Sequence, residues 1–371
     1  MFTAKIDSGV LQRCVSIAAS ALPPRAVDER YESIWIESTP EAIVVSGFGA
    51  SASKHEATAT CEVQGQACIA VNARMFLAAV SSMPDGPVEL LFDGKKVSLK
   101  SAVGILKVLV NVCDRPEIKN RAPNLLFECP KAPLSFAVAA CSFTEMSHKG
   151  THAETTCLLG RGGNAVIFSS RSARACYAEI GPADISGVVK LFFDLPDIKR
   201  ALACCDGEAL SVFYGQGAMR IESDSQDISA SLEFGLVPSR TCHIDTFAKM
   251  EVKAELHFDS TDILSSAVGQ ASVVKLPEYS SVLVAIGESD IVLAYESDCG
   301  LSEMVVPATV VSGQKVSFSA DLDDLAGFMK NIKRCGPAKM SLLSLGGQDR
   351  AIMLANENGS LRMFAALVER N

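Results

Sequence analysis

The alternation of apolar and polar residues predicts short antiparallel strands in the first part of the chain. In "ESIWIES" (32–38), Ile34 and Ile36 share one face and Trp35 lies on the other. A turn at 39–41 leads into the apolar run 42–48, which predicts a hairpin. A second hairpin is predicted at 88–101, where Asp93 and Gly94 form the strongest short hairpin signal.

Helical periodicity separates these hairpins. The segment 72–83 places Met75, Phe76, Ala79 and Val80 on one stripe, and Asn72 precedes it as a predicted N-cap. Similar amphipathic helices are predicted at 11–22, 134–143 and 262–271. The chain therefore mixes helices with antiparallel hairpins, which indicates the α+β class.

These elements recur with nearly one period. Leu11, Leu134 and Leu264 occupy the same place in three predicted helices and are 123 and 130 residues apart. The first hairpins begin at Ile34, Cys157 and Val282, and the strands before the second helices contain Val71, Phe193 and Phe318. A period of this length exceeds that of a solenoid repeat, which is about 20–50 residues. It predicts three domains of similar size.

We expect the domains to span residues 1–120, 121–247 and 248–371. The polar, proline-containing stretches 113–124 and 237–249 lie at the two predicted joints. Each domain is expected to pack two helices against antiparallel sheets.

Composition excludes several classes of protein. Of the 371 residues, 48% are hydrophobic and 21% are charged, as in ordinary folded domains. The sequence shows neither a membrane-spanning run nor an export signal, so a cytoplasmic protein is expected. Its 13 cysteines are scattered without metal-ligand spacing, which predicts reduced thiols and neither metal nor cofactor. The net charge of −9 does not exclude a basic surface elsewhere on the molecule.

Three local patterns partly resemble a nucleotide or metal site, and each favours a structural role. Residues 47–52 fit G-x-G-x-x-A, but the alternating segment that follows predicts a strand where a dinucleotide site needs a helix. His148 and His152 have metal-ligand spacing without a nearby third ligand. Asp321, Asp323 and Asp324 are expected to begin a helix capped by Ser319. No hydrolase or nucleotidase motif is present, so a non-enzymatic protein is expected.

The threefold pattern resembles the bacterial DNA sliding clamp, the beta subunit of DNA polymerase III. The resemblance spans the whole chain and is most specific in 11–25, 69–101 and 114–118, which match the order of a helix ending near an arginine, a helix start, a proline–acid–glycine turn and a hairpin. It implies three clamp domains and a head-to-tail homodimeric ring that encircles duplex DNA without reading its sequence. It also implies that the polymerase alpha subunit and the clamp loader are partners, and that no catalysis is involved.

The resemblance further implies site residues. Phosphate contacts are expected at Arg25, Arg74, His148, Lys149, Lys199 and Arg200, with Lys330, Lys333 and Arg334 as further candidates. A cleft for partner peptides is expected at Ser170, Ala173, Arg174, Ala175, Ala365 and Leu367. The edge strand 103–112 is expected to form the dimer interface through Ile105, Leu106, Val108 and Val110.

A second hypothesis remains open. The chain has Asp194 and Asp197 where the family has basic residues, and the segment 170–176 retains little of the family's cleft motif. Both departures fit a clamp-like paralogue that acts as a protein-interaction module without encircling DNA.

Overall fold

The computed structural model describes residues 1–23, 28–49, 53–117, 120–145, 155–171, 173–183, 185, 190–238, 244–275, 280–298, 300–313 and 315–368. Arg25, His148, Lys149 and His152 therefore lie outside the described residues. None of the described helices is long and apolar enough to span a membrane.

The same order of elements occurs three times: one strand, a helix, three strands, one strand, a second helix and three strands. The first copy comprises β1 (Phe2–Asp7), α1 (Ser8–Ala19), β2 (Ser33–Ser38), β3 (Ala42–Phe48), β4 (Lys54–Thr60), β6 (Cys68–Asn72), α2 (Ala73–Ser81), β7 (Pro87–Phe92), β8 (Lys96–Ser101) and β9 (Gly104–Asn111). The second comprises β10 (Asn124–Pro130), α3 (Lys131–Cys141), β11 (Thr155–Arg161), β12 (Asn164–Arg171), β13 (Arg174–Pro182), β14 (Leu191–Phe193), α4 (Leu195–Cys204), β15 (Ala209–Gly215), β16 (Ala218–Asp224) and β17 (Ile228–Gly235).

The third copy comprises β18 (Glu251–Phe258), α6 (Thr261–Val273), β19 (Ser281–Ile286), β20 (Asp290–Ser297), β21 (Gly300–Pro307), β23 (Ser317–Asp321), α7 (Leu322–Ile332), β24 (Ala338–Leu345), β25 (Gln348–Asn356) and β26 (Leu361–Ala366). Short elements outside the repeat are η1 (Glu29–Tyr31), β5 (Glu62–Gln64), η2 (Ser142–Glu145), α5 (Ile244–Ala248), β22 (Thr309–Ser312) and η3 (Lys333–Cys335). Leu11, Leu134 and Leu264 are all buried, as their shared place in the repeat predicts. The predicted α+β class is confirmed.

By contacts, the described chain forms two compact units, each built on its own sheets. Unit 1 contains residues 1–135 and 196–238, and unit 2 contains residues 136–195 and 239–371. Elements of the second copy are divided between the two units, so the expected domain boundaries remain predictions.

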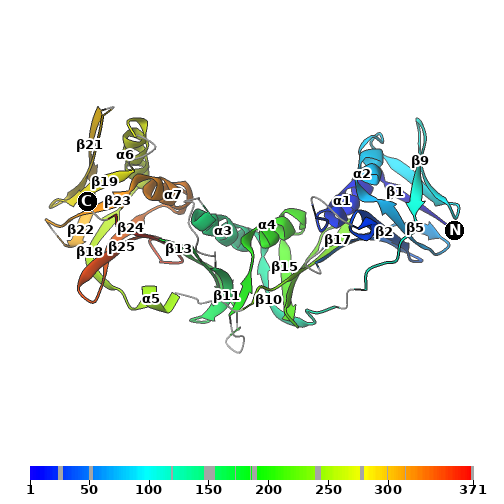
Figure 1. Cartoon of the computed structure of the whole chain (residues 1–371), viewed down its shortest axis with the longest axis horizontal. Helices are drawn as coiled ribbons and strands as arrows, with labels where there is room; N and C mark the ends of the chain where they lie inside the picture. Colours follow the sequence, from blue (N-terminus) through cyan, green and yellow to red (C-terminus); the bar gives the residue numbers. More distant parts are fainter. Residues whose placement is uncertain are drawn as a thin grey trace. The chain divides into compact units, whose positions relative to one another are not determined.

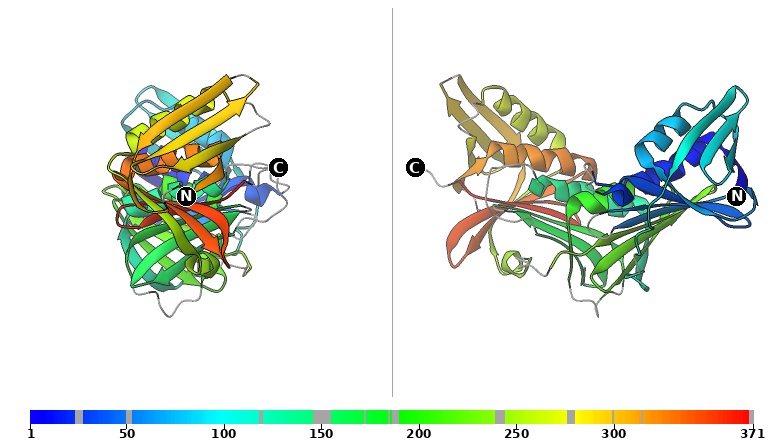
Figure 2. Two further views of the ribbon diagram at one scale, coloured as in Figure 1. Left: turned by 90° about the vertical axis from the view of Figure 1, so that its left-hand side faces the viewer. Right: turned by 45° about the vertical axis from the view of Figure 1, so that its right-hand side comes forward.

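Unit 1 is built on one antiparallel sheet of 13 strands, in the order β10-β15-β16-β17-β4-β3-β2-β6-β9-β8-β7-β1-β5. Helix α1 packs on β3 and β4 and beside α2 (Figures 1 and 2). The approach to β3 is so close that a Cβ at Gly47 would lie 1.9 Å from the carbonyl oxygen of Ala18. The glycine pair 47–49 therefore serves helix–sheet packing, and the predicted strand after it is confirmed as β4.

The helix-facing side of β4 buries one titratable group. A hydrogen bond of 2.6 Å joins Nδ1 of His55 to the Oγ of Ser20, the residue that ends α1. Burial lowers the pKa of His55 to about 4. The imidazole is therefore neutral at pH 7 and belongs to the packing of α1 on the sheet.

Unit 2 has a sheet of nine strands, in the order β14-β11-β12-β13-β26-β25-β24-β18-β22, and a sheet of four, in the order β21-β20-β19-β23. Helix α6 packs on β20 and β21, and α7 packs on β25 and β26 (Figure 1). The cap of α7 differs from the prediction. Asp321 is the N-cap, and its carboxylate accepts from the backbone N–H groups of Asp323 and Asp324. Ser319 lies two residues earlier, paired within strand β23.

Candidate functional site

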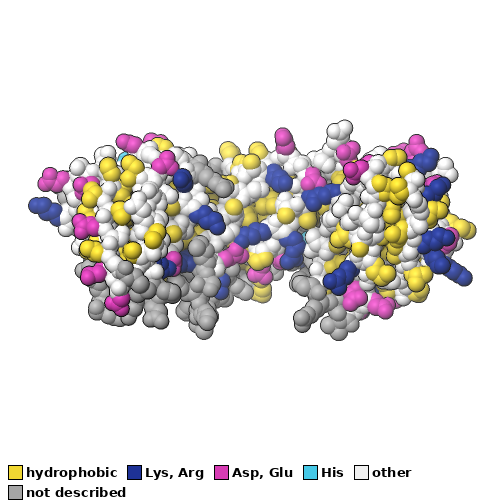
Figure 3. Space-filling view, turned by 90° about the horizontal axis from the view of Figure 1, so that it is seen from above, with side chains coloured by type: hydrophobic (Ala, Val, Ile, Leu, Met, Phe, Trp, Pro, Cys, Tyr) yellow, Lys and Arg dark blue, Asp and Glu magenta, His cyan; other side chains and the backbone are white. Residues whose placement is uncertain are grey.

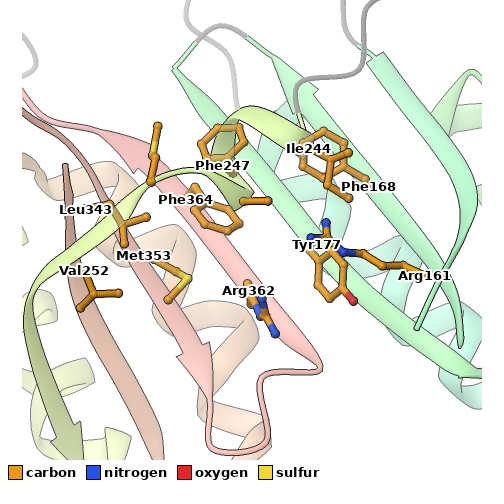
Figure 4. Close-up of a pocket in the computed structure, with 12 residues that line it drawn as sticks. Arg161, Phe168, Tyr177, Ile244, Phe247, Val252, Leu343, Met353, Arg362 and Phe364 are labelled. Atoms are coloured by element: carbon orange, nitrogen blue, oxygen red, sulfur yellow. The ribbon is translucent and has the colours of Figure 1, made fainter. Parts of the chain in front are cut away.

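A pocket of about 230 Å³ lies on the side of the nine-stranded sheet opposite α7, within unit 2 (Figure 4). Its floor is formed by side chains on adjacent strands. Phe168 on β12 is paired with Tyr177 on β13, and Tyr177 is paired with Arg362 on β26. Two residues along, Met353 on β25 is paired with Phe364 on β26. Because alternate residues of a strand face the same side, these rows form one continuous surface.

Helix α5 covers part of this floor. The ring centroid of Phe247 lies 4.6 Å from that of Phe364 and 6.2 Å from that of Phe168. Ile244 and Met250 complete the apolar wall contributed by this segment. Such aromatic clusters bury large apolar area at low entropic cost, and they recur where apolar side chains of partners bind.

The other end of the pocket is polar and basic. The Arg362 guanidinium lies 5.1 Å from the ring centroid of Tyr177, and Arg161 stands beside the same ring (Figure 4). The Tyr177 hydroxyl donates to Glu179 at 2.8 Å, and the other carboxylate oxygen of Glu179 accepts from Asn164 at 3.0 Å. Burial and the Glu179 carboxylate raise the pKa of Tyr177 to about 12, so this hydroxyl remains protonated.

The corresponding face of unit 1 has different chemistry. Strands β3, β4, β17 and β16 hold the places of β12, β13, β26 and β25. Their outer face carries Ser46, Glu56, Glu233 and Arg220 beside the buried ring of Phe48. The segment that follows β9 covers this face through ion pairs: Arg115 with Glu37 at 2.8 Å and Arg121 with Glu233 at 3.2 Å. In unit 1 the Phe48 ring is covered by the Trp35 ring at 5.2 Å and by the Arg115 guanidinium at 5.7 Å, whereas in unit 2 the aromatic floor lines a pocket.

The residues predicted for the peptide cleft lie on both faces of the nine-stranded sheet. Ser170 and Ala175 are paired with each other and share the face of Phe364, although both are buried. Arg174 and Ala365 are paired with each other on the opposite, helix-facing side. Ala173 is exposed in the turn before β13, and Leu367 is half-buried after β26; neither lines the pocket.

Arg174, expected in the peptide cleft, is paired within unit 2. Its guanidinium forms an ion pair with Asp324 of α7, and both side chains are 6% exposed. The guanidinium also lies 5.5 Å from the ring centroid of Phe143. Arg174 therefore joins β13 to α7 beneath the pocket floor and does not reach the pocket.

The predicted dimer edge is open along most of its length. Strand β9 pairs with β8 from Gly104 to Leu109, and it pairs with β6 only at Val110 and Asn111. Ile105 and Leu109 are 60% and 66% exposed, with exposed Lys107 between them. Leu106 is half-buried, and Val108, at 5% exposed, packs in the core of its own unit, so its side chain is not on the exposed row.

A second open edge lies in unit 2. Strand β21 ends the four-stranded sheet, and Leu301 and Val305 are 67% and 59% exposed on either side of exposed Glu303. Among the described residues, no ion pair is formed by Lys107 or Glu303. Exposed apolar edges of this length favour pairing with another strand.

The predicted phosphate contacts are described in part. Arg74 is exposed in the first turn of α2. On α4, Lys199 is half-buried, and Arg200 is exposed with its Nη1 3.6 Å from the Asp197 carboxylate. Lys330 is exposed on α7, and Lys333 forms an ion pair of 3.5 Å with Asp262. Seen from the side of the helices, Figure 3 shows Lys and Arg side chains interspersed with acidic ones.

Among the described residues, no group of three or more His, Cys, Asp and Glu side chains is arranged to hold a metal ion. All cysteines in this part of the chain are free thiols.

No protein-family model matches the sequence, and no curated protein matches it. Solved structures do match in fold. The beta subunit of a Streptococcus pyogenes DNA polymerase aligns with a TM-score of 0.85 at 18% identity, over 99% of this chain and 100% of that one. The DNA polymerase III subunit beta of Pseudomonas aeruginosa aligns with a TM-score of 0.84 at 11% identity, over 99% and 100%. The beta sliding clamp of Caulobacter crescentus aligns with a TM-score of 0.82 at 13% identity, over the full length of both chains.

Proposed function

We propose that this chain, which has the fold of the bacterial DNA polymerase III beta sliding clamp, closes as a head-to-tail homodimer around duplex DNA. In this role it has no catalytic activity of its own. It tethers the cytoplasmic replicative polymerase through the alpha subunit and is placed on DNA by a clamp loader. Processivity follows because a tethered polymerase rebinds the primer end at high effective concentration.

The observation that carries the proposal is the pattern of strand pairing at the joints of the repeat. β4 of the first copy pairs with β17 of the second, and β13 of the second pairs with β26 of the third. Both pairings are antiparallel. Continuing this rule, β21 of the third copy should pair with the first copy's equivalent of β17, which is β9. Both strands have open edges, so the missing partner is supplied by a second molecule, and the second joint closes the ring.

The side chains of the two open edges complement one another. In an antiparallel pairing, Lys107 placed opposite Glu303 brings Ile105 against Val305 and Leu109 against Leu301. Opposite charges and apolar pairs across strands each contribute about 0.2–1 kcal/mol. Because the interface is heterologous and occurs twice in the ring, each such pair counts twice.

DNA contact is assigned to the helices. The exposed Arg74, Arg200 and Lys330 side chains lie on α2, α4 and α7, the second helix of each copy. The residues expected at Arg25, His148 and Lys149 remain predictions. Contacts of this kind reach phosphates and not base edges, which suits a ring that slides.

The partner-peptide site is assigned to the pocket formed by Phe168, Tyr177, Phe247, Met353 and Phe364. The cleft expected from the sequence remains a prediction, and two of its residues, Ala175 and Ala365, are almost wholly buried. An apolar pocket on one face of a sheet suits the apolar anchors of short peptides.

The assembly is tested by the mass of the native protein. The chain has a mass of 39.3 kDa, and a particle of twice that mass is expected at micromolar concentration. Sedimentation equilibrium measures it. A monomer at that concentration would remove the support for a ring and favour the second candidate, a clamp-like interaction module. The ion pair of Arg200 with Asp197 in α4 favours that alternative, because it offsets a positive charge that would otherwise be available to DNA.

A further inference from the structure

We infer that the unit 2 pocket selects peptides in which a large apolar side chain is followed closely by a carboxylate. The inference rests on the proposed function and adds a chemical rule for its partners. Arg161 and Arg362 are the residues that set this rule.

The size of the pocket limits what its apolar part accepts. A dry cavity of about 150 Å³ holds a benzene molecule. The 230 Å³ pocket therefore has room for one aromatic or branched side chain. Phe247, Phe364 and Met353 supply an apolar wall for it.

The polar end of the unit 2 pocket carries two positively charged side chains, Arg161 and Arg362. Arg161 and Arg362 are both close enough to Tyr177 to lower its pKa. Burial and the Glu179 carboxylate raise that pKa by more. Neither guanidinium is paired with a carboxylate of the described residues. Glu179 is the opposing charge, and its two oxygens already accept from Tyr177 and Asn164. The end of the pocket therefore retains an excess of positive charge beside an apolar cavity.

The arginines of unit 1 show the contrasting case. Arg115, Arg121 and Arg220 lie on the corresponding face, and each is held by a glutamate of its own unit. Their charge is already neutralised, whereas that of Arg161 and Arg362 is available to a ligand. Arginine is suited to this task because its planar fork binds carboxylates with two hydrogen bonds.

The occupant is therefore a short acidic–apolar peptide. The two guanidinium groups repel a basic peptide, and a purely apolar peptide forms no ion pair with them.

The test uses the full chain and fluorescein-labelled seven-residue peptides with amidated ends. Each contains one phenylalanine in a glycine–serine background. Aspartate, asparagine or lysine is placed one, two or three residues after the phenylalanine. Fluorescence anisotropy measures the dissociation constants. We expect the best aspartate peptide to bind at least tenfold more tightly than its asparagine counterpart, with a difference that shrinks as salt is added.

Two variants locate the preference. Arg161→Ala combined with Arg362→Ala should reduce the aspartate peptide to the affinity of the asparagine peptide. Arg350→Ala removes an exposed arginine that does not line the pocket and should leave the preference intact. Equal affinity for aspartate and asparagine on the unaltered chain, tighter binding of lysine, or no binding of any peptide would each overturn the inference. If the protein is dimeric but gives one of these results, the proposed ring stands and the peptide inference is wrong. If the protein is monomeric but still prefers the aspartate peptide, the ring is wrong and the peptide inference stands.

Discussion

Lys107→Glu is expected to weaken the dimer by about a hundredfold. The substitution places a second carboxylate opposite Glu303 on β21 of the partner, where the present pair is attractive. A loss of about 1.4 kcal/mol at each joint corresponds to a factor of ten, and the ring has two identical joints. Sedimentation equilibrium over nanomolar to micromolar concentrations measures the change.

The reverse substitution supplies the strongest control. Glu303→Lys alone should weaken the dimer to a similar degree, and the double variant should recover most of the affinity because the charges are only exchanged. Lys95→Glu makes the same charge change at an exposed turn of unit 1 and should leave the dimer unaffected. If the double variant is no better than either single variant, β9 and β21 do not face each other as proposed.

Asp324→Ala is expected to lower the free energy of unfolding by about 3–5 kcal/mol, because it removes the carboxylate of a buried ion pair. Both side chains are 6% exposed, so the Arg174 charge lies where access to water is small. Urea denaturation followed by circular dichroism measures the effect.

Two comparisons separate this effect from a general loss of charge. Asp349→Ala removes one partner of the more exposed ion pair with Lys253 and should cost at most about 1 kcal/mol. Arg174→Met combined with Asp324→Leu replaces the buried pair by apolar groups and should recover most of the lost stability. A single Asp324→Ala variant as stable as the parent would mean that the pair does not hold β13 to α7.

The repeated order of elements was predictable because each copy carries the same periodic signals. Leu11, Leu134 and Leu264 mark equivalent helices, and Asp93-Gly94 joins β7 to β8 as expected, with the Asp93 carboxylate accepting from the N–H groups of Lys95 and Lys96. Such signals are local, so they survive without any knowledge of which strands pair.

The candidate site depends on strand register, which a single sequence does not reveal. A shift of one residue moves a side chain to the other face of a sheet. The predicted cleft combined Ala175 with Arg174 and Ala365, but only Ala175 faces the pocket side. Phe247 was missed because the stretch 237–249 was interpreted as a joint, whereas it contains α5. Its apolar residues, Ile244, Phe247 and Met250, were the available signal.

The measurement that tests the ring most directly is retention on closed circular and linearised plasmid of the same sequence, with a clamp loader and ATP supplied. Gel filtration separates DNA-bound from free protein. The ring predicts that the protein stays on closed circles and is lost from linear DNA through the free ends, and that cutting preloaded circles releases it. Equal retention on circular and linear plasmid, or no retention on either, would contradict encirclement.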